Sequence, residues 1–320
     1  MRRMIILAAI TFAACNQGNR QGSQTDNDSG TAAAPAFSAD SAYACVEKQL
    51  AFGPRIPGTP EQEACAAWLT AYLRALADTV YVQRTTVTAP KQKSLPCINI
   101  IASFNPAAKK RILLLAHWDT RPYADKDAFD KSKQFDGADD GASGVAVLLE
   151  MARQFGLEKP SAGIDILLTD VEDYGESGVE ASYCLGAQYW AKHPHIPGYK
   201  ADYGVLLDMV GGRNSAFYYE SFSRQYAPAQ MKMIWDVGNR SGFSDYFRYE
   251  NNGAGAEDDH YYINTIANIP TLDIIATQPN GNFMPHHHTT NDNIAVIDRR
   301  TLQAVGQTLL NVIYGQPFNY

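Results

Sequence analysis

Apolar and polar residues alternate along this chain in blocks that predict both strands and helices. Six short apolar runs have the length and the β-branched content of strands. Several of them are continuously apolar, which is typical of strands covered on both faces of a sheet. The six predicted strands cover residues 80–87, 98–103, 112–116, 164–169, 205–209 and 272–276.

Helix patterns fill the segments around these strands, at residues 41–51, about 60–77, 144–155, 185–192 and 230–239, and after Asp298. The second helix has the clearest start, because Thr59 suits an N-cap, Pro60 suits the first helical position and Gln62 completes a capping box. Its apolar stripe is expected to be Ala64, Trp68, Tyr72 and Leu76.

The last helix is expected to begin at the N-cap Asp298 and to bury Leu302, Val305, Leu309 and Val312. No repeat and no second linker interrupt the alternation of strands and helices. The pattern therefore predicts one α/β domain over residues 41–320, with a three-layer α/β/α architecture around a central, largely parallel, twisted mixed sheet.

The first 40 residues have a different character. Arg2 and Arg3 precede an apolar run over 4–12, and two small residues then lead to Cys15, which resembles a bacterial lipoprotein signal. Residues 1–15 are thus a predicted signal segment that leaves Cys15 as a lipidated first residue. An ordinary secretory signal cut nearby is the alternative, and both would export the chain. Residues 16–40 are polar and are predicted to form a flexible tether.

The composition limits where the protein can be located and which molecules it can bind. The chain has 320 residues, 45% of them hydrophobic, and a net charge of −7 without long runs of one sign, which argues against nucleic-acid binding. No apolar run has the roughly 20 residues of a membrane-spanning helix. We therefore expect a monomer in the periplasm or on the cell surface, held to a membrane only by a lipid anchor at Cys15. Four cysteines follow Cys15: Cys45, Cys65, Cys97 and Cys184. The sequence leaves open whether they are free thiols or form disulfides.

Polar side chains of ligand type collect where the predicted strands end. Open α/β sheets bind ligands beyond the carboxyl ends of their strands. Carboxylates and imidazoles without thiolates are a combination that suits catalytic zinc. These residues are His117 and Asp119 after one strand, Asp170, Glu172 and Asp173 after the next, Asp208, the turn over 137–144, the acidic run over 257–260 and the histidines at 286–288.

The order of these motifs resembles the zinc-dependent aminopeptidase superfamily, and within it the bacterial glutaminyl cyclases. The resemblance covers about residues 41–314. It rests on residues 116–122 (AHWDTRP), the GADDGASG turn over 137–144, the helix start at 144–152, the run CLGAQYWA over 184–191 and the FGPR loop over 52–55.

This resemblance implies a glutaminyl-peptide cyclotransferase, which turns the N-terminal Gln of a peptide or protein into pyroglutamate and releases ammonia. It implies one zinc per chain, with Asp140, Asp173 and His288 as its ligands. It also implies that Glu172 shuttles the proton and that Asp208 and Asp258 hydrogen-bond around the substrate amine and the shuttle.

Some positions depart from the family pattern. Asp173 stands where many relatives have Glu, and His287 takes the place of an aromatic residue, often Trp. No Trp follows Asp173 as in the animal cyclases, so Tyr174 or Tyr183 is expected to supply that wall. The resemblance also implies a cis peptide bond after Asp140.

Two other functions fit the same fold. A di-zinc aminopeptidase would need five ligands, and each of those positions holds a ligand-capable residue: His117, Asp140, Asp173, Asp208 and His288. In that enzyme Glu172 would activate a metal-bridging water instead of moving the proton of the substrate amine. A non-catalytic binding lipoprotein is the third possibility, although every ligand and the Glu are present.

Overall fold

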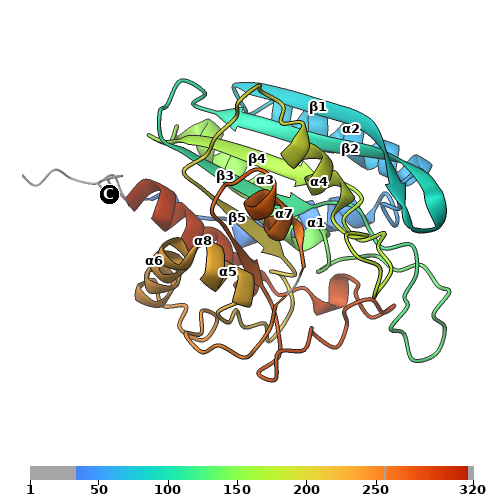
Figure 1. The fold of residues 1–320 in the computed structure, drawn as a ribbon. Helices are drawn as coiled ribbons and strands as arrows, with labels where there is room; N and C mark the ends of the chain where they lie inside the picture. Colours follow the sequence, from blue (N-terminus) through green and yellow to red (C-terminus); the bar gives the residue numbers. More distant parts are fainter. Residues whose placement is uncertain (1–33, 256, 316–320) are drawn as a thin grey trace, which may run out of the picture. The chain divides into compact units, whose positions relative to one another are not determined.

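The structure, a computed structural model, describes residues 34–255 and 257–315, which fold around one six-stranded sheet (Figure 1). The strand order is β1-β2-β4-β3-β5-β6. The pairs from β4 through β3 and β5 to β6 are parallel, and β2 pairs antiparallel with both β1 and β4. The sheet is thus mixed and mostly parallel, as predicted. Its strands are β1 (Thr79–Ala89), β2 (Lys93–Phe104), β3 (Arg111–His117), β4 (Gly163–Thr169), β5 (Tyr203–Asp208) and β6 (Thr271–Ile275).

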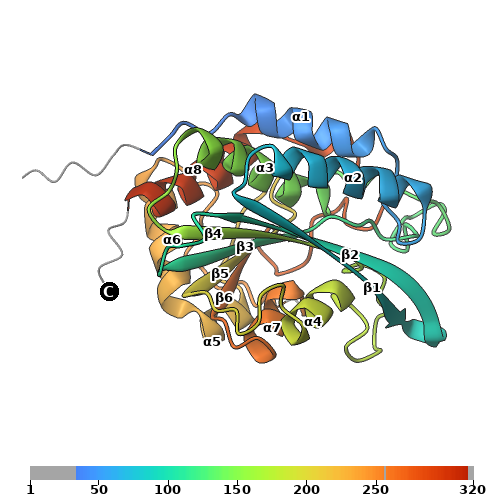
Figure 2. The same cartoon turned by 90° about the horizontal axis from the view of Figure 1, so that it is seen from above.

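Helices cover both faces of this sheet, which confirms the three-layer architecture (Figure 2). One layer holds α1 (Ala39–Leu50), α2 (Pro60–Arg74), α3 (Ala142–Leu157) and α8 (Arg299–Gly315), with α6 (Pro228–Arg240) beside α8. The other holds α4 (Leu185–Lys192) and α7 (Asp259–Thr265), with α5 (Ser221–Tyr226) against β6. Two short 3₁₀ turns, η1 (Pro90–Gln92) and η2 (Ile294–Val296), complete the described elements.

The apolar strands divide their side chains between two hydrophobic clusters, one under each helical layer. Ile100 and Leu114 belong to the larger cluster with α1, α2, α3 and α8. Ile101, Leu113 and Leu115 belong to the smaller cluster on the α4 and α7 side. Successive residues of a strand point to opposite faces, so a strand covered on both sides must be apolar throughout. This explains why the central strands read as continuous apolar runs.

All six predicted strands and all six predicted helices are present, but the apolar stripe of α2 is different from the prediction. Ala64 is exposed, whereas Cys65, Leu69 and Leu73 are buried. Trp68, Tyr72 and Leu76 still pack against the core as partly buried residues, so the predicted stripe lies at the edge of the buried face and not at its centre. Thr59 caps the helix as expected, but Gln62 accepts a hydrogen bond from the backbone N–H of Gly58, not from that of Thr59.

The folded part of the chain begins earlier than predicted. Phe37 is only 5% exposed and packs over Gly306 of α8, and its backbone N–H donates to Gln307 Oε1 at 2.9 Å. Ser38 caps α1 by accepting a hydrogen bond from the backbone N–H of Ser41. The predicted tether over 16–40 therefore overlaps packed structure from about residue 37. The predicted signal segment over 1–15, Cys15 and residues 16–33 lie outside the described residues.

Two further observations bear on the setting predicted from the sequence. Within the described ranges, no helix is long and apolar enough to cross a membrane. The four cysteines after Cys15 are all buried free thiols, which decides the open question between thiols and bridges in this structure.

Candidate active site

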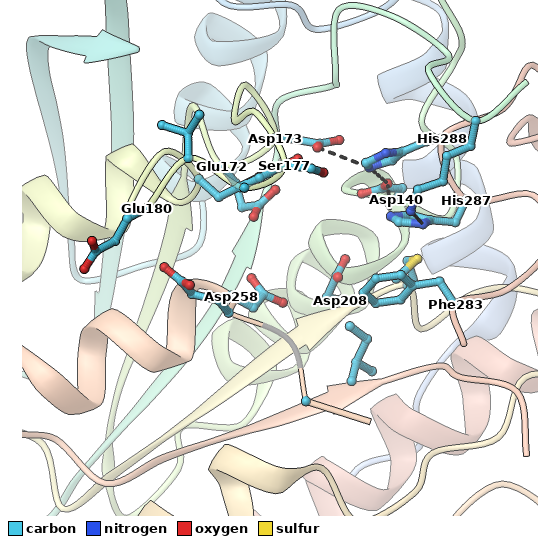
Figure 3. Close-up of a pocket in the computed structure, with 18 residues that line it drawn as sticks. Asp140, Glu172, Asp173, Ser177, Glu180, Asp208, Asp258, Phe283, His287 and His288 are labelled. Atoms are coloured by element: carbon cyan, nitrogen blue, oxygen red, sulfur yellow. Dashed lines mark hydrogen bonds and ion pairs between the residues drawn. The ribbon is translucent and has the colours of Figure 1, made fainter. Parts of the chain in front are cut away.

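A cavity of about 540 Å³ opens where β3, β4, β5 and β6 end, at the edge of the sheet predicted from the strand pattern (Figure 3). All six residues to which the sequence assigned a role line it: Asp140, Glu172, Asp173, Asp208, Asp258 and His288. Figure 3 shows Asp140, Asp173 and His288 close together, with Asp258 and Asp208 across the cavity from Asp173 and His288. The fold thus brings together residues that lie far apart in the sequence, such as Asp140 and His288.

The turn before α3 positions Asp140. Asp292 holds this turn, because its two carboxylate oxygens accept the backbone N–H groups of Asp139 at 2.8 Å and Asp140 at 3.1 Å. Gly141 follows with φ +94°, and a Cβ there would lie 2.8 Å from the backbone O of Asp119. Only glycine fits this approach. No peptide bond in the described residues is cis, so the expected cis bond after Asp140 is not found.

Asp119 positions the adjacent acids Glu172 and Asp173. Its carboxylate accepts the backbone N–H of Glu172 at 3.0 Å and that of Asp173 at 3.2 Å. β4 has already ended at Thr169, and Val171 has a left-handed backbone with φ +54°. The two acids therefore follow a turn and not the strand itself, and they reach different partners. Asp173 approaches His288, and Glu172 approaches Cys184 and Asp258.

The predicted metal ligands form a group with free acceptor atoms. Nε2 of His288 lies 3.2 Å from Oδ1 of Asp173 and 3.6 Å from Oδ2 of Asp140. Oδ2 of Asp140 and Oδ2 of Asp173 are buried and have no hydrogen-bond partner among the described residues. Orphaned carboxylate oxygens next to an imidazole nitrogen fit a catalytic zinc site. His287 is a further candidate, because ligand atoms of Asp140, His287 and His288 all lie within 4.8 Å of one another.

Arg121 and Asp125 support these ligands from behind. Oδ1 of Asp125 lies 3.0 Å from Nδ1 of His288, which leaves Nε2 of that ring facing the other ligands. Arg121 donates to Oδ2 of Asp125 at 2.8 Å and to Oδ1 of Asp173 at 3.2 Å. One arginine thus connects two of the predicted ligands. In the sequence, Arg121 is marked only as part of the AHWDTRP motif, and no motif marks Asp125.

The charges in the cavity depend strongly on one another. Burial would raise the pKa of Asp140, but a hydrogen bond from His117 and the nearby histidines hold it well below its usual range. Burial would lower the pKa of His288, but Asp173 and Asp125 raise it to about 9. Asp140 and His288 therefore favour their charged forms, whereas burial, opposed by His288, raises the pKa of Asp173.

The acids on the other side of the cavity behave differently. Burial, opposed by His117, raises the pKa of Glu172 well above its usual range. Burial also raises the pKa of Asp208 to about 6, and burial together with Asp208 raises the pKa of Asp258 to about 7. Acids with raised pKa values can exchange protons near neutral pH, which is what a general acid–base group requires.

His117 creates a second group of possible ligands. Its Nε2 lies 3.1 Å from Oδ1 of Asp140 and 3.4 Å from Oδ1 of Asp208. These three residues also have ligand atoms within 4.8 Å of one another. The geometry therefore keeps the five-ligand, two-metal arrangement as an alternative.

Aromatic and apolar residues form the remaining wall. Tyr183 lines the cavity, whereas Tyr174 lies outside it, with the Lys93 ammonium 4.6 Å from its ring centroid. His287 packs against Phe283, with ring centroids 4.3 Å apart, and its Nδ1 lies 2.9 Å from Nζ of Lys126. Of the two tyrosines considered from the sequence, Tyr183 is the one that supplies the wall.

Comparisons with known proteins agree with this geometry. The sequence model described as "Peptidase family M28" matches residues 99–313. A crystal structure described as a Zn-dependent exopeptidase from Parabacteroides distasonis is 46% identical, covers 89% of this chain and 100% of its own, and superposes with a TM-score of 0.87. The glutaminyl cyclase of Bacteroides thetaiotaomicron, bound to N-acetylhistamine, is 45% identical over the same shares, with a TM-score of 0.86. The glutaminyl-peptide cyclotransferase of Drosophila melanogaster is 28% identical over 272 residues, 78% of this chain and 73% of the relative.

Proposed function

The chain belongs to peptidase family M28, and we propose that it is a glutaminyl-peptide cyclotransferase that converts the N-terminal Gln of peptides and proteins to pyroglutamate and releases ammonia. The similarity to bacterial glutaminyl cyclases over almost the whole described chain supports this activity. The observation that carries the proposal is the position of Glu172. This acid lines the same cavity as the metal-ligand group, and it lies beside Cys184 and Asp258 rather than within that group.

The predicted ligands Asp140, Asp173 and His288 would hold one zinc at the reaction centre, with their orphaned oxygens as the evidence of fit. Bound zinc supplies a Lewis acid that polarises the γ-carbonyl of the substrate and stabilises the oxygen as it becomes negative.

The chain's own acids carry out the rest of the reaction. Asp208 and Asp258 bind the α-amine of the substrate and hold it against the γ-amide, which makes the attack intramolecular. A bond forms between the α-nitrogen and the γ-carbonyl carbon, and the bond from that carbon to the amide nitrogen breaks. Glu172 takes the proton from the α-nitrogen and delivers it to the amide nitrogen, which leaves as ammonia.

The second candidate function is a di-zinc aminopeptidase, favoured by the group His117, Asp140 and Asp208. In that reaction water attacks the peptide bond, and the product is a free N-terminal amino acid. The two functions therefore differ in their products, whatever the metal count. A purely binding role lacks support, because the acids and imidazoles that both reactions need are all in place.

Product analysis on matched peptides tests the proposal. With Gln-peptides, the wild-type chain is expected to produce the pyroglutamyl peptide and ammonia, and to leave Leu- and Ala-anilides intact. Glu172→Gln should keep its zinc and lose turnover by about 10² or more, the usual scale for a positioned acid–base group. Asp173→Ala should lose zinc as well as activity. Release of free amino acids by the wild type would overturn the cyclase and favour the aminopeptidase.

The setting of the enzyme is part of the same proposal. Export through the signal over 1–15 and lipidation of Cys15 would place the domain in the periplasm or on the cell surface, as a monomer held to the membrane by its lipid alone. Peptides and proteins with an N-terminal Gln would reach it there. The support is the N-terminal sequence.

A further inference from the structure

A second hollow lies next to the active-site cavity, on the other side of its rim, and has a volume of about 500 Å³. Asp173 lines the cavity and Glu176 lines the hollow, whereas Ser177 lines both (Figure 3). The rim divides in the same way at two neighbouring residues, because Asp125 lines the hollow and Lys126 lines the cavity. A peptide that leaves the cavity over Ser177 therefore enters this hollow.

The hollow continues into another one of about 490 Å³. The two share the lining residues Lys93, Pro122, Tyr123 and Tyr174, so together they form one groove, which we call the outer groove. The tip of the β1–β2 hairpin forms one of its walls. This hairpin extends past the other strands of the sheet, because β2 pairs with β4 only from Ile100 onward (Figure 2).

The outer groove has stiff walls with aromatic and apolar surface. Proline fixes its own backbone φ, and four prolines line the groove: Pro57, Pro90, Pro96 and Pro122. Tyr123 is 54% exposed, so its ring is available to whatever occupies the groove. Grooves lined by aromatic residues are a common way to bind extended peptides, and a groove that is already formed loses little entropy on binding.

The charge of the lining changes between the cavity and the outer groove. Among the described residues, seven Asp and Glu line the cavity against one lysine, Lys126. The outer groove is lined instead by Lys91, Lys93 and Arg121 against two acids. A peptide that spans both regions is therefore matched best when its positively charged N-terminus is followed by a negatively charged side chain.

Lys93 is the basic residue of the outer groove that is free to bind such a side chain. Lys91 is paired with Glu176 at 3.0 Å, and Arg121 is paired with carboxylates of the metal site. In the described part of the chain, Lys93 forms no ion pair. Its ammonium lies 4.6 Å from the centroid of the Tyr174 ring and donates a hydrogen bond to the Tyr174 hydroxyl. The tyrosine thus holds the ammonium in the groove without neutralising its charge.

We propose that the outer groove binds the part of the substrate that follows its N-terminal Gln, and that Lys93 makes the enzyme prefer peptides and proteins with an acidic residue in this part. The inference rests on the proposed function, because it places the Gln residue itself in the cavity. The cavity then selects the first residue, and the outer groove discriminates among chains that share it.

Competition between matched peptides tests the preference. Each peptide is a Gln followed by five alanines and a C-terminal amide, with Glu, Gln or Lys in place of one alanine at a time. Mass spectrometry of a mixture gives the ratio of kcat/KM from the consumption of each peptide. At one position, the Glu peptide should be consumed about 2- to 5-fold faster than the Gln peptide, the scale of one exposed ion pair.

Variants of Lys93 assign the preference to the groove. Lys93→Gln should abolish it, and Lys93→Glu should reverse it in favour of the Lys peptide. Lys109→Glu is the matched control, because this exposed lysine lies between β2 and β3 and lines neither part of the outer groove. Its preference should equal that of the wild type. Equal consumption of all peptides by the wild type, or a preference that survives Lys93→Gln, overturns the proposal.

Failure of the proposed function would look different from failure of this inference. If free amino acids are released, consumption still reports the preference, because the measurement does not depend on the product. If no peptide is consumed, calorimetric Kd values of the same peptides on the zinc-loaded wild type report it instead, with the same expected ratio. An acetylated Glu peptide that binds as tightly as the free one would show that the groove acts without the cavity, and it would overturn the assignment to the substrate.

Discussion

At the residue scale, two residues behind the predicted metal ligands hold those ligands close to one another. Asp125 contacts Nδ1 of His288, and Arg121 links Asp125 to Asp173. A carboxylate behind a histidine ligand fixes the orientation of the ring and raises its basicity, and its loss usually costs about 10- to 100-fold in metal affinity. The pair thus orients two of the predicted ligands from outside the cavity lining.

Asp125→Asn should therefore weaken zinc binding by about 10- to 100-fold, because the amide keeps the shape but removes the charge. Competition with a chelator of known affinity measures this change. Excess zinc should restore much of the activity, which separates a positioning role from a direct catalytic one.

Asp130→Asn is the matched control, since Asp130 lies on the same loop and bonds only to Ser132 among the contacts described for its side chain. Its zinc affinity should equal that of the wild type. If Asp125→Asn binds zinc as tightly as this control does, Asp125 is not a support of the metal site.

Residue roles could be predicted from the sequence where a motif marks them. Asp140, Glu172 and His288 stand in recognisable runs at strand ends, and they line one cavity. Asp125 carries no such signal, because its contact with His288 arises from the path of an irregular loop, which no periodic pattern encodes.

At the element scale, long periodic segments were predictable and short ones were not. Long apolar runs make the central strands and α3 recognisable in the sequence. In contrast, α5 and α7 span only 6 and 7 residues. Helices of that length show fewer than two full turns of periodicity. Their formation depends on caps such as Glu220 and Asp258, whose side chains the sequence assigned to other roles or to none.

The start of the folded domain was also predicted wrongly, because the composition around Phe37 is typical of a tether. Phe37 lies in a segment rich in Ala, Pro and Ser, so a single aromatic residue was counted with the tether. Its ring packs on α8, and a Cβ at Gly306 would lie 2.1 Å from it. Burial of one large side chain is enough to anchor such a segment.

Phe37→Ala should lower the free energy of unfolding by about 3 kcal/mol, the lower end of the range for buried Phe→Ala changes. Chemical denaturation of a chain that starts at residue 34 measures the loss. Phe129→Ala provides the comparison, because Phe129 is 99% exposed and its truncation should leave stability nearly unchanged. Equal stabilities of the two variants would restore the boundary to residue 40.

At the scale of the whole molecule, the parallel part of the sheet is what makes one site from scattered segments. The carboxyl ends of β3, β4, β5 and β6 meet at one edge, and each is followed by a loop that carries cavity residues. Strand polarity was predictable from the alternation of strands and helices. The distances that decide between one and two metals at the reaction centre were not predictable, because they depend on side-chain positions that no sequence pattern encodes.

The N-terminal sequence predicts how the whole enzyme is held at the membrane. Residues 16–33 are polar, and a random chain of their length reaches roughly 25 Å, enough to separate a domain that begins near Phe37 from a lipid on Cys15. The tether should therefore set location without affecting catalysis. Full-length chain expressed in a bacterium that processes lipoproteins should be found in the membrane fraction, and Cys15→Ala should move it to the soluble fraction. The chain that starts at residue 34 should match the kcat/KM of the full-length enzyme on soluble Gln-peptides, because none of the described residues before Lys126 lines the cavity. Membrane association that survives Cys15→Ala would contradict the lipid anchor, and a large loss of kcat/KM in the shortened but folded chain would show that the N-terminal segment contributes to the site.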